Sequence, residues 1–288
     1  MLVQFLLTGL ALGSIYGLVA LGFAVIYKAE RVFNFAQGIL MVCGAYLAYT
    51  ATTQLGLPFP VAVIVIIAAA ALLGIVIQFL FIRPLSGQPL LPVIMITIAL
   101  SIILKALIEI LYGVQPKPLA TSLPTGVLIL GDVRLSQLNL TAAVVSWVCM
   151  GVFFAFFRFT KAGLLMRATA DSHEAAILSG VNVNRINAGA WAIGTILAVI
   201  GGVFLGQIQL ASTELEHIGL LALPAVVIGG LQSIPGAIVG GILVGVIEQL
   251  ASGYISPKAR DVFIYIPLLI MLLVRPWGLF GNRELGRV

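Results

Sequence analysis

The stretch QFLLTGLALGSIYGLVALGFAVIY, residues 4–27, contains no charged side chain. It is longer than the roughly 20 residues with which an α-helix crosses the hydrocarbon core of a bilayer. No basic segment precedes it, so we expect a retained span rather than a cleaved signal peptide. Gly9, Gly13 and Gly17 recur every four residues, which predicts one helix face that packs closely against a neighbour. The same spacing recurs later in the chain, at Gly202 and Gly206, Gly236 and Gly240, and Gly241 and Gly245.

The composition extends this interpretation to the whole chain. Of 288 residues, 61% are hydrophobic and 9% are charged, and the mean hydropathy is +1.18. Soluble domains are about 45–50% apolar and about 25% charged, so a water-soluble fold is excluded. We interpret the formal charge of +5 as the excess of basic residues that orients a membrane protein, and not as a sign of nucleic-acid binding. We predict an all-α, polytopic transmembrane bundle of eight to ten spans, with apolar blocks at about 4–27, 36–54, 60–82, 90–112, 140–157, 186–206, 218–232, 234–254 and 262–280.

The seventh of these blocks is short and contains helix breakers. It includes Pro224, Gly229 and Gly230, and Pro235 and Gly236 follow at once. Irregular backbone at membrane depth is tolerated where protein or a water-filled cavity covers it. The region 218–236 is therefore either a span of its own or a re-entrant segment.

The basic residues predict the orientation, because cytoplasmic loops are enriched in Lys and Arg. We expect an external N-terminus, a cytoplasmic C-terminus and a cytoplasmic segment at 158–187, with 113–139 as an external loop that holds a hairpin strand at 127–130. This places ten basic residues inside, namely Lys28, Arg31, Arg83, Arg158, Lys161, Arg167, Arg185, Arg275, Arg283 and Arg287, against Lys117, Arg134, Lys258 and Arg260 outside.

The segment 158–187 contains the signals of a short helix outside the lipid. Asp171 is expected as its N-cap, with Glu174 three residues later as in a capping box. Gly180 suits a left-handed C-terminal cap. The helix between them would present a small apolar knob flanked by charge, which suits docking in a cleft of a partner. An ordinary solvated loop with one helical turn is the alternative.

Several motifs resemble the LivH-type permeases of branched-chain amino-acid ABC transporters. They are GLVALGFAVIY ending at Tyr27, then Phe33-Asn34-Phe35-Ala36-Gln37-Gly38, with Gln37 where the family often has His. Further along are Gly163-x-x-x-Arg167-Ala and Leu178-x-Gly180-Val-Asn182-x-x-Arg185. The last are Ile228-Gly-Gly-Leu-Gln-Ser-Ile-Pro235-Gly-Ala-Ile-Val-Gly-Gly241 with Glu248, and Arg275-Pro-x-Gly278-Leu-Phe-Gly281. Their order and spacing cover nearly the whole chain.

The resemblance implies a single permease domain, residues 1–288, in a bacterial inner membrane. It implies a second homologous permease, two cytoplasmic ATPase subunits and a periplasmic solute-binding protein as partners, with no cofactor. The segment around Arg167–Arg185 would be the coupling helix that engages an ATPase. The coupling residues would be Gly163, Arg167, Asp171, Glu174, Ala175, Gly180, Asn182 and Arg185.

Polar residues within the apolar blocks are the other candidates, since a charge at the bilayer centre costs roughly 2.5–3.5 kcal/mol on insertion scales. Lys105 and Glu109 lie four residues apart and are expected to pair. Asn34 and Gln37 are expected to cap the second span. The remaining pathway or helix-break candidates are Gly230, Pro235, Gly236 and Glu248.

The sequence offers no chemistry of its own to drive transport. It contains no G-x-x-x-x-G-K-[ST] loop, which cradles nucleotide phosphates, and it has no cluster with the spacing of a metal site and no catalytic constellation. We therefore expect a permease, not an enzyme, that moves branched-chain amino acids while partner subunits hydrolyse ATP. The alternatives are the same machinery for urea, amides or a sugar, an ion-coupled carrier, and a channel.

Overall fold

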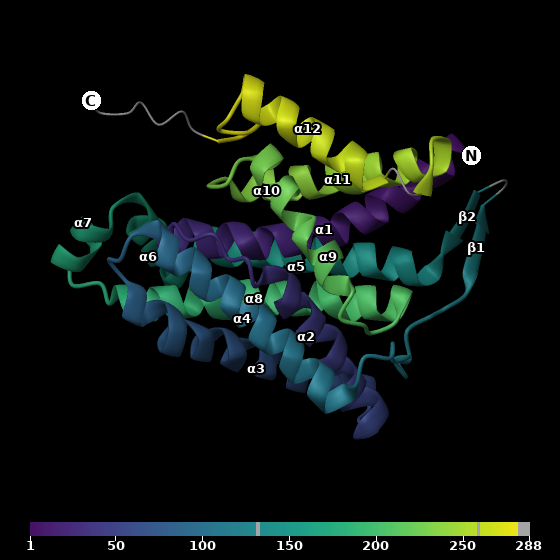
Figure 1. The fold of residues 1–288 in the computed structure, drawn as a ribbon, viewed down its shortest axis with the longest axis horizontal. Coiled ribbons are helices and arrows are strands. Elements are labelled where there is room, and N and C mark those ends of the chain that lie inside the picture. Colours follow the sequence, from purple (N-terminus) through teal and green to yellow (C-terminus); the bar gives the residue numbers. More distant parts are fainter. Residues whose placement is uncertain (131–132, 258–259, 282–288) are drawn as a thin grey trace.

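The computed structural model describes residues 1–130, 133–257 and 260–281. These residues form a bundle of helices that run mostly along one direction, with one small hairpin (Figure 1). Six of the described helices are long and apolar enough to cross a membrane, and the predicted all-α bundle is confirmed. The chain is a multi-pass membrane protein.

The helices follow the predicted apolar blocks closely. The six long ones are α1 (Leu2–Glu30), α3 (Phe59–Ile77, continued by η2 and η3 to Leu85), α4 (Leu90–Tyr112), α5 (Gln137–Phe159), α8 (Val183–Gln209) and α11 (Ile234–Tyr254). Shorter helices are α2 (Gln37–Tyr49, continued by the π-helix η1 to Gln54), α6 (Lys161–Asp171), α7 (His173–Leu178), α9 (Leu215–Leu220), α10 (Ala222–Gly229) and α12 (Arg260–Val274). Strands β1 (Val127–Leu130) and β2 (Val133–Ser136) pair in antiparallel register, which confirms a hairpin in the 113–139 loop.

Contacts between segments far apart in the sequence show which of them lie at each end of the bundle. At one end, the α7 end, residues 28–31, 82–88, 169–173 and 232–235 line two neighbouring cavities. At the other, the N-terminal end, Lys117 pairs with Ala211 through the backbone, and Phe5 stacks edge-on against Tyr254. Eight of the ten basic residues predicted to be cytoplasmic lie in the described chain, and they belong to segments at the α7 end (Figure 1).

The glycines of α1 bring it into close contact with α11. A Cβ on Gly13 would lie 2.8 Å from Ile242 Cα, and one on Gly17 would lie 3.2 Å from Ile238 O. From the other side, a Cβ on Gly241 would clash with the backbone of Gly17, and one on Gly245 with that of Gly13. The two helices run antiparallel with backbone against backbone, as small residues at four-residue spacing permit. The glycine-spacing prediction is confirmed for this pair.

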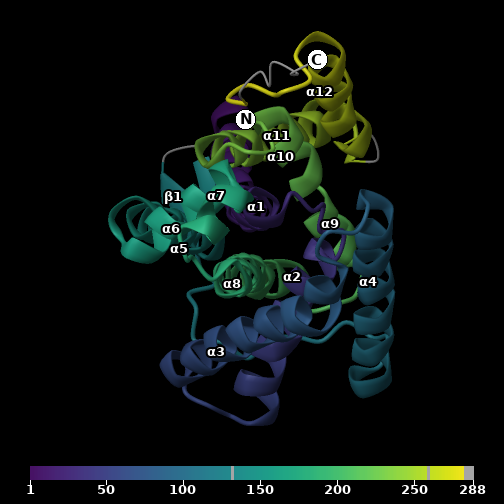
Figure 2. The same cartoon turned by 90° about the vertical axis from the view of Figure 1, so that its left-hand side faces the viewer.

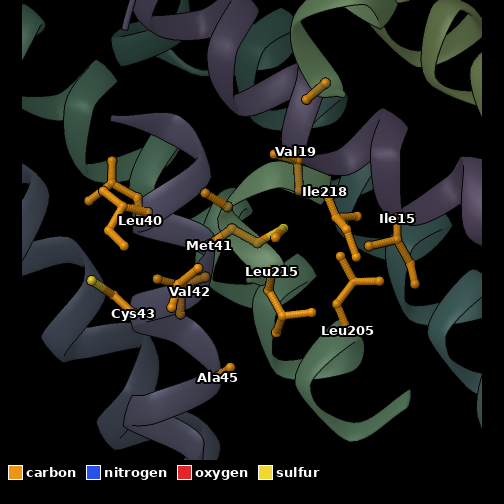
Figure 3. Close-up of a cluster of buried hydrophobic side chains, with 14 of the residues drawn as sticks. Ile15, Val19, Leu40, Met41, Val42, Cys43, Ala45, Leu205, Leu215 and Ile218 are labelled. Carbon is orange, nitrogen blue, oxygen red and sulfur yellow. The ribbon is translucent and has the colours of Figure 1, made fainter. Parts of the chain in front are cut away.

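The core lies where α1, α2, α8 and α9 meet (Figure 3). Ile15 and Val19 of α1, Met41 of α2, Leu205 of α8 and Leu215 of α9 are all buried there. Gly202 allows this approach, because a Cβ on it would clash with Met41 O. α1 and α8 are thus the central helices, while α3, α4 and α5 lie around them (Figure 2). Many apolar side chains of these three outer helices are exposed.

The seventh predicted block, 218–232, corresponds to two short consecutive helices. α9 and α10 together cover residues 215–229, about 22 Å at 1.5 Å per residue, which is less than the ~30 Å of hydrocarbon. The segment starts beside Lys117 at the N-terminal end and reaches the cavity-lining residues 232–235 at the α7 end. This segment and Val262–Val274 are the shorter apolar helices that accompany the six long ones in the described chain, and the exact number of spans stays a prediction.

The last predicted block, 262–280, is longer than the helix. α12 ends at Val274, and the chain then turns through Gly278, whose φ is 79°. The N–H groups of Leu279 and Phe280 donate to the carbonyl oxygens of Ile228 (2.9 Å) and Gly229 (3.0 Å). These carbonyls belong to the last turn of α10, where no helical partner is available. The motif at 275–281 therefore caps α10.

Candidate functional site: the α6–α7 segment and its surroundings

The α6 helix folds back onto the end of α5. Thr160 begins it as an N-cap, and its hydroxyl accepts a hydrogen bond from Gly163 N–H (3.0 Å). Gly163 is buried, because a Cβ there would clash with the carbonyl oxygens of Phe156 and Phe157. The segment is thus fixed to a membrane span at its first turn.

Arg167 also connects α6 to the end of α5. Its guanidinium donates to the carbonyl oxygens of Phe157 and Arg158 and lies 5.4 Å from the centre of the Phe157 ring. Cations are favourable near a helix C-terminus, where the carbonyl groups lack partners. Of the predicted coupling residues, Gly163 and Arg167 therefore hold α6 on α5, and their role in coupling stays a prediction.

The next helix, α7, begins one residue later than predicted. Asp171 is the last residue of α6, and the N-cap is Ser172, whose hydroxyl accepts from Ala175 N–H (3.2 Å). The prediction of Asp171 as the cap was wrong because Asp171 continues the helical turn of α6. Glu174 is then in the first turn of α7, where a carboxylate is favourable at the positive end of the helix dipole.

The end of α7 is a Schellman motif. Gly180 N–H donates to Ile177 O (2.9 Å), Val181 N–H donates to Ala176 O (3.0 Å), and Gly180 has φ 80°. This is the left-handed cap that glycine adopts without strain, as predicted. Two residues later Asn182 begins α8, with its side chain accepting from Arg185 N–H (3.2 Å).

α7 is therefore a six-residue helix fixed at both ends, and its tip is apolar. Ala176 is buried against the bundle, while Ile177 is 59% exposed and Leu178 is 89% exposed. Glu174, Ala175 and Arg185 are exposed around them. Figure 1 shows α7 at the far left, beyond the ends of the long helices. The predicted knob is present, with Ile177 and Leu178 as its exposed apolar residues.

Behind α7 lies a cavity of about 430 Å³ whose wall includes a polar cluster that the sequence did not reveal. Glu30, at the end of α1, lines it with Asn187 of α8 and His173 of α7. The Glu30 carboxylate accepts hydrogen bonds from Trp191 Nε1 (2.7 Å) and from Gln78 Nε2 (3.5 Å). One carboxylate thus joins α1, α8 and the π-helical end of α3 directly behind the α6–α7 segment.

We expect Trp191→Phe to destabilise the protein by about 1–3 kcal/mol, since it leaves the Glu30 carboxylate short of a charge-assisted partner. Trp147→Phe is the matched control, because the Trp147 ring is 50% exposed on α5 and surface changes of this kind stay within about 0.5 kcal/mol. Thermal unfolding of the detergent-purified protein measures both. Equal midpoints for the two variants would show that the Glu30 cluster contributes no stability.

Ion pairs between helices differ from the predicted pairing. Lys105 Nζ of α4 lies 3.2 Å from Glu216 Oε2 of α9, and Glu109 instead accepts from the Thr213 hydroxyl (3.1 Å). The predicted Lys105–Glu109 pair was wrong because the Glu216 side chain of α9 reaches α4 and places its carboxylate beside Lys105. Glu248, 3% exposed, lies 3.5 Å from Arg260 Nη1 and links α11 to α12.

Comparison with known proteins decides the family. Residues 5–272 match the family described as "Branched-chain amino acid transport system / permease component". The chain belongs to this permease family.

Individual relatives also align with nearly the whole chain. The high-affinity branched-chain amino acid transport system permease protein LivH of Escherichia coli (strain K12) is 30% identical over 302 residues, 99% of this chain and 97% of the relative. The corresponding protein BraD of Pseudomonas aeruginosa is 31% identical over 300 residues, with the same coverage. The structure titled "PsaBC from Streptococcus pneumoniae in complex with Fab" shares the fold, with a TM-score of 0.51 and 15% identity over 95% of this chain and 92% of that chain.

The Asn34–Gln37 motif of this permease lies at the start of α2, inside the bundle. Asn34 Oδ1 accepts from Ala36 N–H (3.1 Å), and its amide donates to Gln37 Oε1 (3.0 Å). Gln37 Nε2 donates in turn to Val19 O of α1 (3.3 Å) and Gly194 O of α8 (3.4 Å). Both side chains are at most 2% exposed, and they bind backbone groups of the turn before α2, of α1 and of α8. The predicted capping was wrong, because α2 has no side-chain cap and the Gln37 amide binds carbonyl groups of its neighbours instead.

The Gly230–Gly236 motif forms the tight turn between α10 and α11. Gly230 has φ 109°, and the Ser233 hydroxyl caps α11 by accepting from Gly236 N–H (3.1 Å). Pro235 is in the first turn of α11, where its missing N–H costs nothing. A Cβ on Gly236 would clash with Gly229 O. In this permease the residues make a helix break, and a role in the pathway stays a prediction.

Proposed function

We propose that this chain is the transmembrane permease subunit of an ATP-driven importer that moves branched-chain amino acids across a bacterial inner membrane. The observation that carries the proposal is the family match over residues 5–272, together with relatives aligned over 99% of the chain that are branched-chain amino acid permeases by name. The bundle supplies the membrane part, and ATP hydrolysis belongs to other subunits.

α7 is the contact for an ATPase subunit in this proposal. Its caps hold it rigidly between α6 and α8, and its exposed Ile177 and Leu178 suit an apolar cleft. Burial of each of these side chains in a partner's pocket would stabilise the contact by about 1.5–3 kcal/mol. The α7 end is then cytoplasmic, consistent with the basic residues gathered there. The other partners we propose are a second, homologous permease, a second ATPase subunit and a periplasmic solute-binding protein.

Motion of the ATPase would reach the spans through two connections. Gly163 and Arg167 fix α6 to the end of α5, and Asn182 fixes the other end of the segment to α8. α8 is a central helix that contacts α1, α2 and α3. A displacement of α7 would therefore move α8 and the core helices packed on it, through contacts that already exist in this structure.

The test is leucine uptake by proteoliposomes that contain the whole importer, with ATP inside the compartment that corresponds to the cytoplasm. The wild type should accumulate leucine only with ATP, and Gly180→Val should lose most of that uptake, because a left-handed conformation costs a non-glycine residue about 1–2 kcal/mol. Gly56→Val is the control: Gly56 has φ 60° and equally open surroundings, but it lies at the N-terminal end. Uptake without ATP, or equal effects of the two substitutions, would refute the proposal.

A further inference from the structure

Charged side chains gather on α9, at the depth of the membrane. Lys105 and Glu216 form an ion pair between α4 and α9, with side chains 42% and 18% exposed. Glu214 and His217, on the same short helix, are also exposed. Together with the Glu216 carboxylate they make one side of α9 strongly polar. Figure 2 shows α9 between α4 and α10 at the margin of the bundle.

The position of this cluster along the membrane follows from its contacts. The Ser101 hydroxyl, halfway along α4, donates to Glu216 Oε1. A Cβ on Gly38, at the start of α2 within the bundle, would lie 2.6 Å from Glu216 O. The pair is therefore near mid-membrane, about one helical turn from the level of Glu109 and Thr213. A polar surface at that depth does not face lipid, because ionised side chains there face protein or water.

The backbone around the cluster is that of a broken crossing helix. α9 and α10 meet at Leu221 and Ala222, so the crossing consists of two short helices. Interrupted helices in transporters occur at substrate sites near the bilayer midplane. The partly exposed ion pair beside this break offers one positive and one negative group. These are the two charges that would bind the α-carboxylate and the α-ammonium group of an amino acid.

We propose that Lys105 and Glu216 form a transient site for the zwitterionic head group of the transported amino acid. Glu216 receives the α-ammonium group and Lys105 receives the α-carboxylate, so the protein's ion pair is exchanged for two ion pairs with the substrate. No net charge enters the membrane at any stage, which keeps the cost of the step low. Ile102 and Ile98, exposed on α4 one turn and two turns before Lys105, offer an apolar surface to the branched side chain. This inference rests on the proposed function.

A purely structural ion pair predicts different behaviour. Replacing both partners of a buried pair by neutral residues of similar size is often neutral or stabilising, whereas removing one partner leaves an uncompensated charge. The double variant Lys105→Met with Glu216→Gln therefore separates the two roles, and it avoids the folding defect expected of either single change. The control is Arg134→Met, which removes an exposed charge on strand β2.

The experiment is ATP-driven leucine uptake by the reconstituted importer, with subunit assembly measured on the same samples. We expect the Lys105/Glu216 double variant to assemble and to lose roughly tenfold or more of the uptake, while Arg134→Met keeps most of it. The charge-swapped variant Lys105→Glu with Glu216→Lys retains a pair but inverts it, and it should also transport poorly. Wild-type uptake in the neutral or swapped variant, or failure of the neutral variant to assemble, would overturn the site. Failure of the wild type itself to transport leucine would instead refute the proposed function.

Discussion

Gly241→Val should prevent the protein from accumulating in the membrane. A Cβ at this position would clash with the N and Cα atoms of Gly17, which are backbone atoms at the centre of the bundle. Overpacking costs about 1–3 kcal/mol where side chains can move. Here only separation of α1 from α11 relieves the clash, and the whole interface is lost with it. The measurement is the amount of monodisperse protein recovered in detergent.

Gly151→Val is the control for this substitution. Gly151 lies in the membrane span α5, and a Cβ there would meet nothing within 4 Å. We expect near-normal yield for Gly151→Val and little or none for Gly241→Val. Similar yields for the two variants would mean that the α1–α11 contact is not as close as described.

Leu178→Asp should abolish uptake while leaving the permease folded. Leu178 is 89% exposed at the tip of α7, so its replacement costs little in the isolated chain. In the assembled importer, a carboxylate in an apolar cleft is desolvated without a partner. Loss of such an anchor weakens an interface by about 2–4 kcal/mol, or roughly 30- to 1,000-fold in affinity. Co-purification of the ATPase and leucine uptake both measure it.

Leu55→Asp provides the comparison at the opposite end of the bundle. Leu55 is 63% exposed in the turn after η1, and the chemical change is identical. We expect Leu55→Asp to retain the ATPase on purification and Leu178→Asp to lose it. Retention of the ATPase by Leu178→Asp would remove α7 from the interface.

The sequence predicted those parts of the fold that depend on local pattern. Lipid-facing blocks gave the positions of the spans, and the spacing of Gly9, Gly13 and Gly17 identified a packed face that meets α11. Gly180 was predicted as a helix cap from its type alone, and the Schellman motif confirms it. Each of these features is determined by residues within one helix or turn.

Features that depend on distant contacts were not predictable in this way. Lys105 was expected to pair with Glu109 on its own helix, but it pairs with Glu216, whose side chain reaches it from α9. Arg167 was predicted as a coupling residue, and its contact with the end of α5 was not foreseen. The Glu30 cluster joins three helices far apart in the chain, and no local pattern marks it.

The most direct test of the account locates the tip of α7 in the assembled importer. Leu178→Cys is introduced after the native Cys149 is replaced, with Cys43 buried and left in place. A membrane-impermeant thiol reagent should label it only from the cytoplasmic side, and a short cross-linker should join it to the nucleotide-hydrolysing subunit. Labelling from the periplasmic side, or no cross-link to that subunit in the active importer, would contradict the account.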